Sequence, residues 1–306
     1  MKLKVSRKGF LALTGNLSNA DSSERHFIAK NTRHPFDILK LALDGFYRAQ
    51  KELIDSEKIH AIDPDRRKSK AISDYFLELD RFYDASLLVM KAMSPASDYD
   101  NQNVEVWLKK ERSGEYTRYK DSVSASHKII RKIANKLKHD SIELRYIHIV
   151  SHNDKTINGF YFSQIVGENS LVGPDTDIHK DYKGTKTAMS YNYSIMYGIG
   201  FISLCMASLN KIIFSNSNVE ESTHGIESVF SAIMNCSEIK MDFFPNEYSQ
   251  PTSVVTKSGD FVTVEFPKRI RASKHVDRIR DSKPLFLFNQ RTSTANDQYP
   301  YYHLIS

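Results

Sequence analysis

The sequence predicts a mainly helical α+β protein. Between residues 35 and 140, apolar side chains recur every three or four positions, which is the period of a helix that buries one face. Around residues 142–166, and again after residue 238, apolar side chains alternate with polar ones, as in a strand with one buried side. A helical body with small β-hairpins or sheets added to it belongs to the α+β class.

The composition is that of an ordinary globular chain. Forty per cent of the 306 residues are apolar and 26% are charged. Cys205 and Cys236 form no CxxC pair, which argues for a reducing compartment and against a disulfide framework or a thiolate zinc site. The basic residues 1–15 contain too short an apolar run for a signal peptide. We therefore expect a cytoplasmic protein with no membrane partner.

The first elements follow from local signals. Residues 1–34 are expected to form short strands and turns, with a turn at residues 14–16. A helix is expected to open at Pro35, since proline suits the first turn, and to continue to about residue 58. After a break at residues 63–65, a second helix with a broad apolar face runs to about residue 94.

A basic helix or helix pair comes next, interrupted near residues 113–114. Residues 107–140 contain seven Lys, three Arg and four acids, so their net charge of +6 equals that of the whole chain. Residues 122–139 contain no Pro or Gly and place isoleucines, an alanine and a leucine on one face. This face is expected to be buried.

The second half of the chain is expected to mix strands and helices. Two strands form a hairpin over about residues 142–166, and a turn-rich loop covers residues 167–186. An apolar helix follows over about residues 187–214. Its most apolar stretch, about fifteen residues long, is short of the roughly twenty that span a bilayer, so a buried helix is expected.

The C-terminal part is expected to be β-rich. A short helix over residues 226–234 precedes strands at residues 239–243, 253–256 and 261–266. The chain is therefore divided into an N-terminal segment (1–34), a helical bundle with an inserted hairpin (35–235) and a β-rich basic segment (236–306).

A stripe of polar side chains on the basic helix is a candidate catalytic site. Lys128, Lys132, Asn135 and His139 follow one another at spacings of four, three and four, so they share one side of the helix, with Arg131 beside them. Histidine can act as a general acid or base near neutral pH, and a lysine or arginine can stabilise charge developing on a phosphate. This set suits metal-independent cleavage of RNA, in which the 2′-hydroxyl is the nucleophile.

The stripe resembles the HEPN superfamily of helical bundles. Its ribonuclease members place an arginine four to six residues before a histidine, commonly with an asparagine after the arginine, and act at a dimer cleft. Here Asn135 and His139 match the asparagine and the histidine, whereas Ala134 stands where the arginine is usual. Lys132 lies at the outer limit of the family spacing, and Arg131 lies one residue beyond it.

The resemblance covers about twenty residues closely and residues 35–140 and 187–235 as a helical framework. It implies a homodimeric, metal-independent endoribonuclease without a cofactor, with a role as a toxin or in antiviral defence. His139 would be the acid or base, Asn135 its orienting partner, and Lys132 or Arg131 the phosphate contact.

Further cations are candidates for RNA binding. A sequence pI near 9.0 favours anionic partners, of which nucleic acid is the commonest. On the basic helix these cations are Lys128, Lys136 and Lys138. A second cluster over residues 267–280 has six basic residues and one acid, and Arg269, Arg271 and Lys274 are its candidates.

Two other interpretations stay open. One is a non-catalytic helical module that binds a protein partner, in which Asn135 and His139 are buried and hydrogen-bonded to each other. The other is a metal-dependent hydrolase, although solvated loop residues are the simpler account of its candidate ligands. These are His148, His152, Asp154, Asp175, Asp177, His179 and Asp181. We expect no bound metal, and phosphate-loop and GxSxG patterns are absent.

Overall fold

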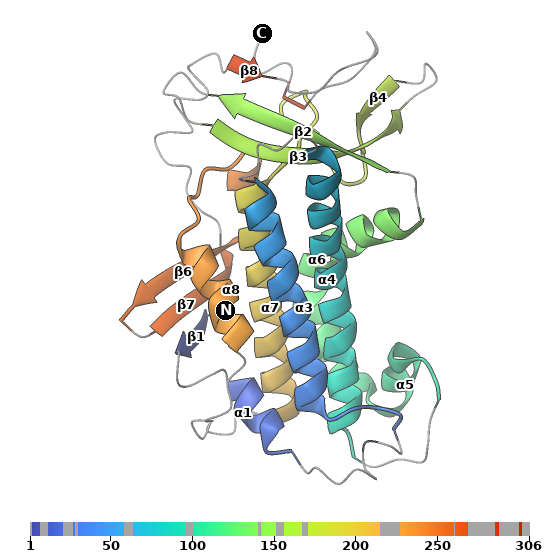
Figure 1. Cartoon of the computed structure of the whole chain (residues 1–306). Helices are drawn as coiled ribbons and strands as arrows, with labels where there is room; N and C mark the ends of the chain where they lie inside the picture. Colours follow the sequence, from blue (N-terminus) through green and yellow to red (C-terminus); the bar gives the residue numbers. More distant parts are fainter. Residues whose placement is uncertain are drawn as a thin grey trace.

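The computed structural model has a bundle of long helices as its centre (Figure 1). It describes residues 2–6, 12–20, 27, 30–57, 64–95, 101–139, 142–150, 156–166, 171–214, 227–259, 261–268, 285–287, 300 and 301. Over these residues the protein is a mixed α+β structure with small antiparallel sheets, as the sequence predicted.

Four long helices form the bundle. They are α3 (Pro35–Glu57), α4 (Pro64–Met93), α6 (Ser113–His139) and α7 (Tyr191–Phe214). The helix α4 packs against α3, α6 and α7, and α6 packs against α7. The interior is rich in aromatic rings, such as Tyr75, Phe76 and Phe201, all of them buried. The three helices predicted in α3, α4 and α6 are confirmed. The helix α4 begins at Pro64, inside the predicted break, and α6 begins at Ser113, at the predicted interruption.

The helix α7 is the most apolar element. It is long and apolar enough to cross a membrane by length and composition, but 61% of its most apolar window is buried inside the protein. Its neighbours include α4, α6 and two strands. This burial agrees with the predicted core helix.

Shorter helices flank the bundle. They are α1 (Ala12–Ser18), α5 (Val104–Glu111) and α8 (Glu227–Ser237), with the 3₁₀ turn η1 (Glu247–Ser249). The helix α1 packs against α3 and α7, α5 against α4 and α6, and α8 against α3 and α7.

One sheet lies across the end of the bundle where α6 finishes (Figure 1). Its main strand order is β4 (Leu171–Pro174), β3 (Thr156–Val166), β2 (Glu143–Val150) and β8 (Leu285–Leu287), and β5 (Met189–Ser190) also pairs with β3. The pairing of β2 with β3 confirms the predicted hairpin.

A second sheet joins the two ends of the chain. Its order is β1 (Lys2–Ser6), β7 (Phe261–Lys268) and β6 (Thr252–Ser258), all antiparallel. Residues from the N-terminal segment and from the C-terminal segment thus share one sheet. The predicted division of the chain at residues 34 and 235 therefore separates segments whose strands lie in the same sheet.

Four local predictions are wrong. The loop expected over residues 167–186 contains the strand β4, because residues 171–174 pair with β3. Residues 14–16 lie inside α1 instead of a turn, because Leu13 and Leu17 bury one side of this helix. Residues 239–243 form no strand, since Phe243 and Phe244 are both buried and consecutive side chains of a strand point to opposite sides. The helix expected from residue 187 begins at Tyr191, after Ser190, whose Oγ accepts a hydrogen bond of 3.2 Å from the Tyr193 N–H.

Candidate functional site

The C-terminal half of α6 presents the predicted stripe to solvent. Ile130, Ile133 and Ala134 are buried on the opposite side of the helix. Asn135 and His139, one turn apart, are exposed. No hydrogen bond joins these two side chains, so the described structure does not have the buried, mutually bonded pair that a purely structural motif would require.

A buried carboxylate holds the cations on one side of the stripe. Asp80 of α4 has no exposed surface. It receives hydrogen bonds from Arg131 Nη1 at 2.9 and 3.0 Å, from Lys138 Nζ at 2.9 Å and from the ring of His127 at 3.1 Å. Burial alone would raise the pKa of Asp80, but the hydrogen bonds from His127, Lys138 and Arg131 outweigh it and lower the pKa to about 2. Asp80 is therefore ionised and positions three side chains of α6.

A second carboxylate holds the cations on the other side. Asp175, which follows β4, is also fully buried and accepts a hydrogen bond from Lys136 Nζ. The other oxygen of Asp175 accepts bonds from the backbone N–H groups of Asp177 and Ile178, at 2.8 and 3.0 Å, and so closes its own loop. Lys132 lies 3.6 Å from Asp177, at a more exposed ion pair.

The result is a row of cations whose charged groups are each bound to a carboxylate. The side chains of Arg131 and Lys138 are 46% and 42% exposed although their partner is buried. The bonds from Arg131 to Asp80 use Nη1, and no hydrogen bond among the described residues uses Nε or Nη2. An arginine anchored through one nitrogen keeps other donors for a phosphate.

His127 is the histidine that the sequence interpretation missed. Its ring stacks on Tyr83 at 3.9 Å between centroids and on Phe201 at 5.7 Å, and it is nearly buried. A ring held between two aromatic rings and a carboxylate is fixed in place, so we assign it a positioning role for Asp80. The signal that could have indicated it is an acid, Asp80, inside the apolar pattern of α4.

The candidate metal ligands serve other contacts. His179 accepts a 2.9 Å hydrogen bond on Nε2 from the Phe162 N–H, and burial lowers its pKa to about 3. His148 Nδ1 lies 2.7 Å from Asn158 Oδ1. No group of three His, Cys, Asp or Glu side chains that could hold a metal occurs among the described residues. His152 and Asp154 lie outside them.

Only the first two residues of the second basic cluster are among the described residues. Arg269, Arg271 and Lys274 lie outside the described residues. Lys268, the last residue of β7, forms an ion pair of 2.6 Å with Glu265.

The comparisons with known proteins give no family. No family model, no curated protein and no solved structure matches the chain.

Proposed function

We propose that the exposed end of α6 binds RNA and cleaves it without a metal, as a HEPN-like endoribonuclease in which His139 is the proton-transfer group. The observation that carries the proposal is the position of Asn135 and His139. They stand exposed in one row, between cations whose charged groups are held by two buried carboxylates. Such a row presents donors for phosphate oxygens beside an imidazole that can take or give a proton.

The proposed reaction needs only groups from the protein and the RNA. The 2′-oxygen forms a bond to the adjacent phosphorus while the bond from phosphorus to the 5′-oxygen breaks. One proton leaves the 2′-hydroxyl and one proton reaches the 5′-oxygen, so the products are a 2′,3′-cyclic phosphate and a 5′-hydroxyl. His139 takes or gives one of these protons, and Asn135 orients its ring or a substrate oxygen.

The neighbouring cations would stabilise the charge on the phosphate. Arg131 retains donors that Asp80 does not use, and Lys132 is held only by a loose, exposed pair with Asp177. Five cations stand along this face, Lys128 included, against the four carboxylates Asp80, Asp84, Asp175 and Asp177. The surplus of charge is small, so we expect modest affinity that depends on salt.

The resemblance to the HEPN superfamily also makes a homodimer part of the proposal. Each chain supplies only one His139. Two proton transfers need two groups, and a second copy of α6 would provide the second one. Cytoplasmic location and a toxin or defence role follow from the resemblance in the same way.

A second candidate function rests on the ion pairs. Arg131, Lys132, Lys136 and Lys138 each contact a carboxylate, an arrangement that also serves to pin α6 to α4 and to the loop after β4. In that case the protein is a non-catalytic module for a protein partner.

The deciding experiment is RNA cleavage in the presence of a chelator. We expect the wild type to produce 2′,3′-cyclic phosphate ends, and His139→Ala to lose this activity while its melting temperature is unchanged. Lys132→Ala is expected to slow cleavage. The matched control is Arg118→Ala, which removes an exposed cation from the same helix at a point roughly 30 Å along the axis from His139. Absence of cleavage on structured and unstructured RNAs, with wild type and variants alike, would reject catalysis in favour of the module.

A further inference from the structure

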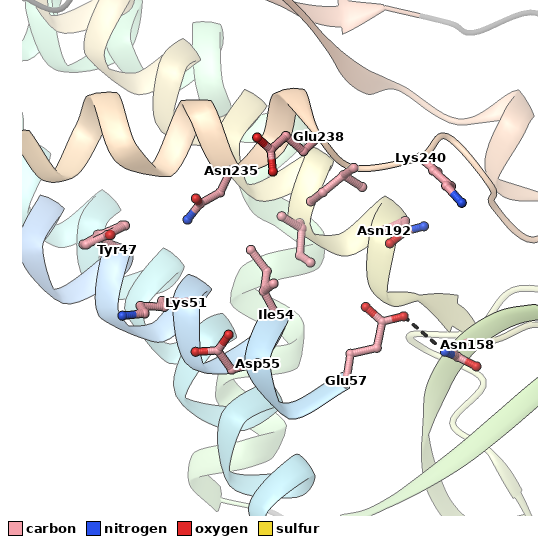
Figure 2. A pocket seen from close by; sticks show the side chains of 12 residues that line it. Tyr47, Lys51, Ile54, Asp55, Glu57, Asn158, Asn192, Asn235, Glu238 and Lys240 are labelled. Atoms are coloured by element: carbon pink, nitrogen blue, oxygen red, sulfur yellow. Dashed lines mark hydrogen bonds between the residues drawn. The ribbon is translucent and has the colours of Figure 1, made fainter. Parts of the chain in front are cut away.

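A cleft of about 770 Å³ opens on a different part of the molecule. It lies where α3, the first turn of α7, the C-terminal end of α8 and β3 meet (Figure 2). Its volume is within the range of roughly 300–1,000 Å³ that small-molecule sites occupy. None of the predicted site residues lines it.

The cleft combines amide side chains with an apolar base. Asn158, Asn192 and Asn235 reach it from three different elements. Ile195 is 1% exposed, and Ile54 and Ile239 are partly buried against the core. A hydrophobic base with a few converging polar groups is the usual construction of a ligand site.

Several polar groups in the cleft have no hydrogen-bond or ion-pair partner among the described residues. Within the part of the chain that the structure describes, no hydrogen bond or ion pair engages the side chains of Asn192, Asn235, Lys51 or Lys240. Figure 2 shows Asn235 and Asn192 on opposite sides of Ile54, with Glu57 between Ile54 and Asn158. These donors and acceptors are available to a ligand.

A second groove, between α3 and α4, provides a comparison for the pairing of charged side chains. A groove of about 620 Å³ between α3 and α4 is also lined by charged side chains. There the charged side chains form ion pairs with one another: Arg67 with Glu52, Lys70 with Asp74 and Arg81 with Glu78. The cleft at α8 differs because two of its amides, Asn192 and Asn235, and both of its lysines have no partner among the described residues.

One wall of the cleft is held in a fixed orientation. His148 Nδ1 and Asn158 Oδ1 are 2.7 Å apart, and Asn158 Nδ2 donates to Glu57 Oε1 at 3.2 Å. This chain fixes the amide of Asn158 and one oxygen of Glu57. The other oxygen of Glu57 keeps its capacity to accept hydrogen bonds. A carboxylate oriented in this way is prepared for a pair of hydroxyl donors.

The charges of the lining select the class of ligand. Two lysines and three carboxylates nearly balance, which disfavours a polyanion such as nucleic acid. Carboxylates accept from hydroxyls, lysines donate to them, amides do both, and isoleucine packs against C–H groups. We propose that this cleft binds a neutral ligand through a vicinal diol, carried by a saccharide or by the ribose of a nucleoside. This site is independent of the function proposed for α6.

The test is a binding screen on the full chain. Ligand-observed NMR and calorimetry would be run with neutral mono- and disaccharides and with uncharged ribonucleosides, each beside its deoxy analogue. We expect binding by at least one diol, with about five- to tenfold weaker binding of the analogue that lacks one hydroxyl. The saccharide and nucleoside arms identify the source of the diol.

Three variants locate the site. Asn192→Ala and Asn235→Ala are each expected to weaken binding about fivefold or more, since each removes a hydrogen-bond partner. Asp74→Asn, in the ion-paired groove, should leave binding unchanged. The proposal is overturned if no member of the panel binds, if deoxy analogues bind equally well, or if both asparagine variants bind like the wild type. A peptide or an anion that binds in their place would also overturn it.

Discussion

At the scale of single residues, the most unusual group is the carboxyl of Glu247, which is 1% exposed. It accepts hydrogen bonds from Ser190 N–H at 2.8 Å, Ser190 Oγ at 2.6 Å and Phe244 N–H at 2.7 Å. Burial raises its pKa to about 8 although these bonds favour the carboxylate. Glu247 therefore joins the turn before η1 to the start of α7 as a carboxylic acid near neutral pH.

This raised pKa predicts that stability falls with rising pH. The folded state binds the Glu247 proton more tightly than the unfolded chain, so its advantage is complete below the ordinary value near 4.5 and disappears as pH rises through about 8. We expect the unfolding free energy to fall by a few kcal/mol across this window. Glu247→Gln should flatten this part of the profile in denaturant titrations at pH 5, 7 and 9. An unchanged slope in this variant, matched against exposed Glu238→Gln, would contradict the assignment.

Asp80 gives a prediction of the opposite sign. Its lowered pKa means that its contribution is present above the ordinary value of 3.8 and is lost as pH falls through about 2. Asp80→Asn leaves Lys138 without a charged partner among the described residues, and leaves Arg131 with only its 3.9 Å pair to Asp84. We expect it to cost roughly 2 kcal/mol at pH 7 and much less at pH 2.5. Urea unfolding at the two pH values measures the difference.

The matched control for that prediction is Asp84→Asn. Asp84 is 55% exposed and lies 3.9 Å from Arg131, so its loss should change stability by less than about 0.5 kcal/mol. Equal effects of the two substitutions would mean that Asp80 does not anchor α6.

The sequence could indicate the candidate site only in part. Helical period placed Asn135 and His139 on one side of α6, because that depends on neighbours three and four residues away. It could not indicate that Asp80 and Asp175 hold the cations. Those contacts span about forty to sixty residues, and no local pattern encodes which acid reaches which lysine.

At the scale of elements, two glycines let α7 approach its neighbours. A Cβ on Gly198 would lie 1.9 Å from Tyr75 Oη, and a Cβ on Gly200 would lie 2.3 Å from the Phe266 ring. The first contact is with α4 and the second is with β7. Both sides of α7 therefore depend on the absence of a side chain.

Gly198→Ala should be destabilising although alanine favours helices. The new methyl group must displace Tyr75, which is fully buried and donates from Oη to the backbone oxygens of Ser194 and Ile195. We expect a loss of about 1–3 kcal/mol in thermal or denaturant unfolding. Gly114→Ala in α6 is the matched control. Nothing lies within 4 Å of its added methyl group, so the helix preference for alanine should stabilise the protein by up to about 1 kcal/mol. If both variants gain stability, α7 and α4 are not in tight contact.

The prediction of elements succeeded where apolar spacing repeated over many helical turns, and it failed where tertiary packing determines the local structure. The helices α3, α4 and α6 carry many periods of apolar spacing and clear breaks between them. The short helix α1 contains Gly15 and Asn16, which favour turns, and its packing against α3 and α7 stabilises it as a helix.

At the scale of the whole molecule, the arrangement of the sheets lay beyond sequence reasoning. Each strand of the pair β6 and β7 was predicted, but β1, which pairs with the other edge of β7, comes from the other end of the chain. Strand pairing over more than 250 residues depends on how the helices bring the termini together. The same holds for Tyr301, which donates from Oη to Ala188 O at 3.1 Å.

This arrangement predicts that the chain cannot be divided at residue 235. A protein ending there would lack β6 and β7, and with them Phe266, which covers α7 at Gly200, and Ser253, whose Oγ donates to Met196 O. It would also lack Glu247, which holds Ser190 at the start of α7. We expect residues 1–235 to unfold without a cooperative transition in circular dichroism and to be cut rapidly by chymotrypsin. Residues 1–268 keep both strands and form the control, with a lower melting temperature but a single transition. Should residues 1–235 melt cooperatively at the temperature of the full chain, position 235 would be a true domain boundary, and the sheet of β1, β7 and β6 would be an addition to a bundle that is stable alone.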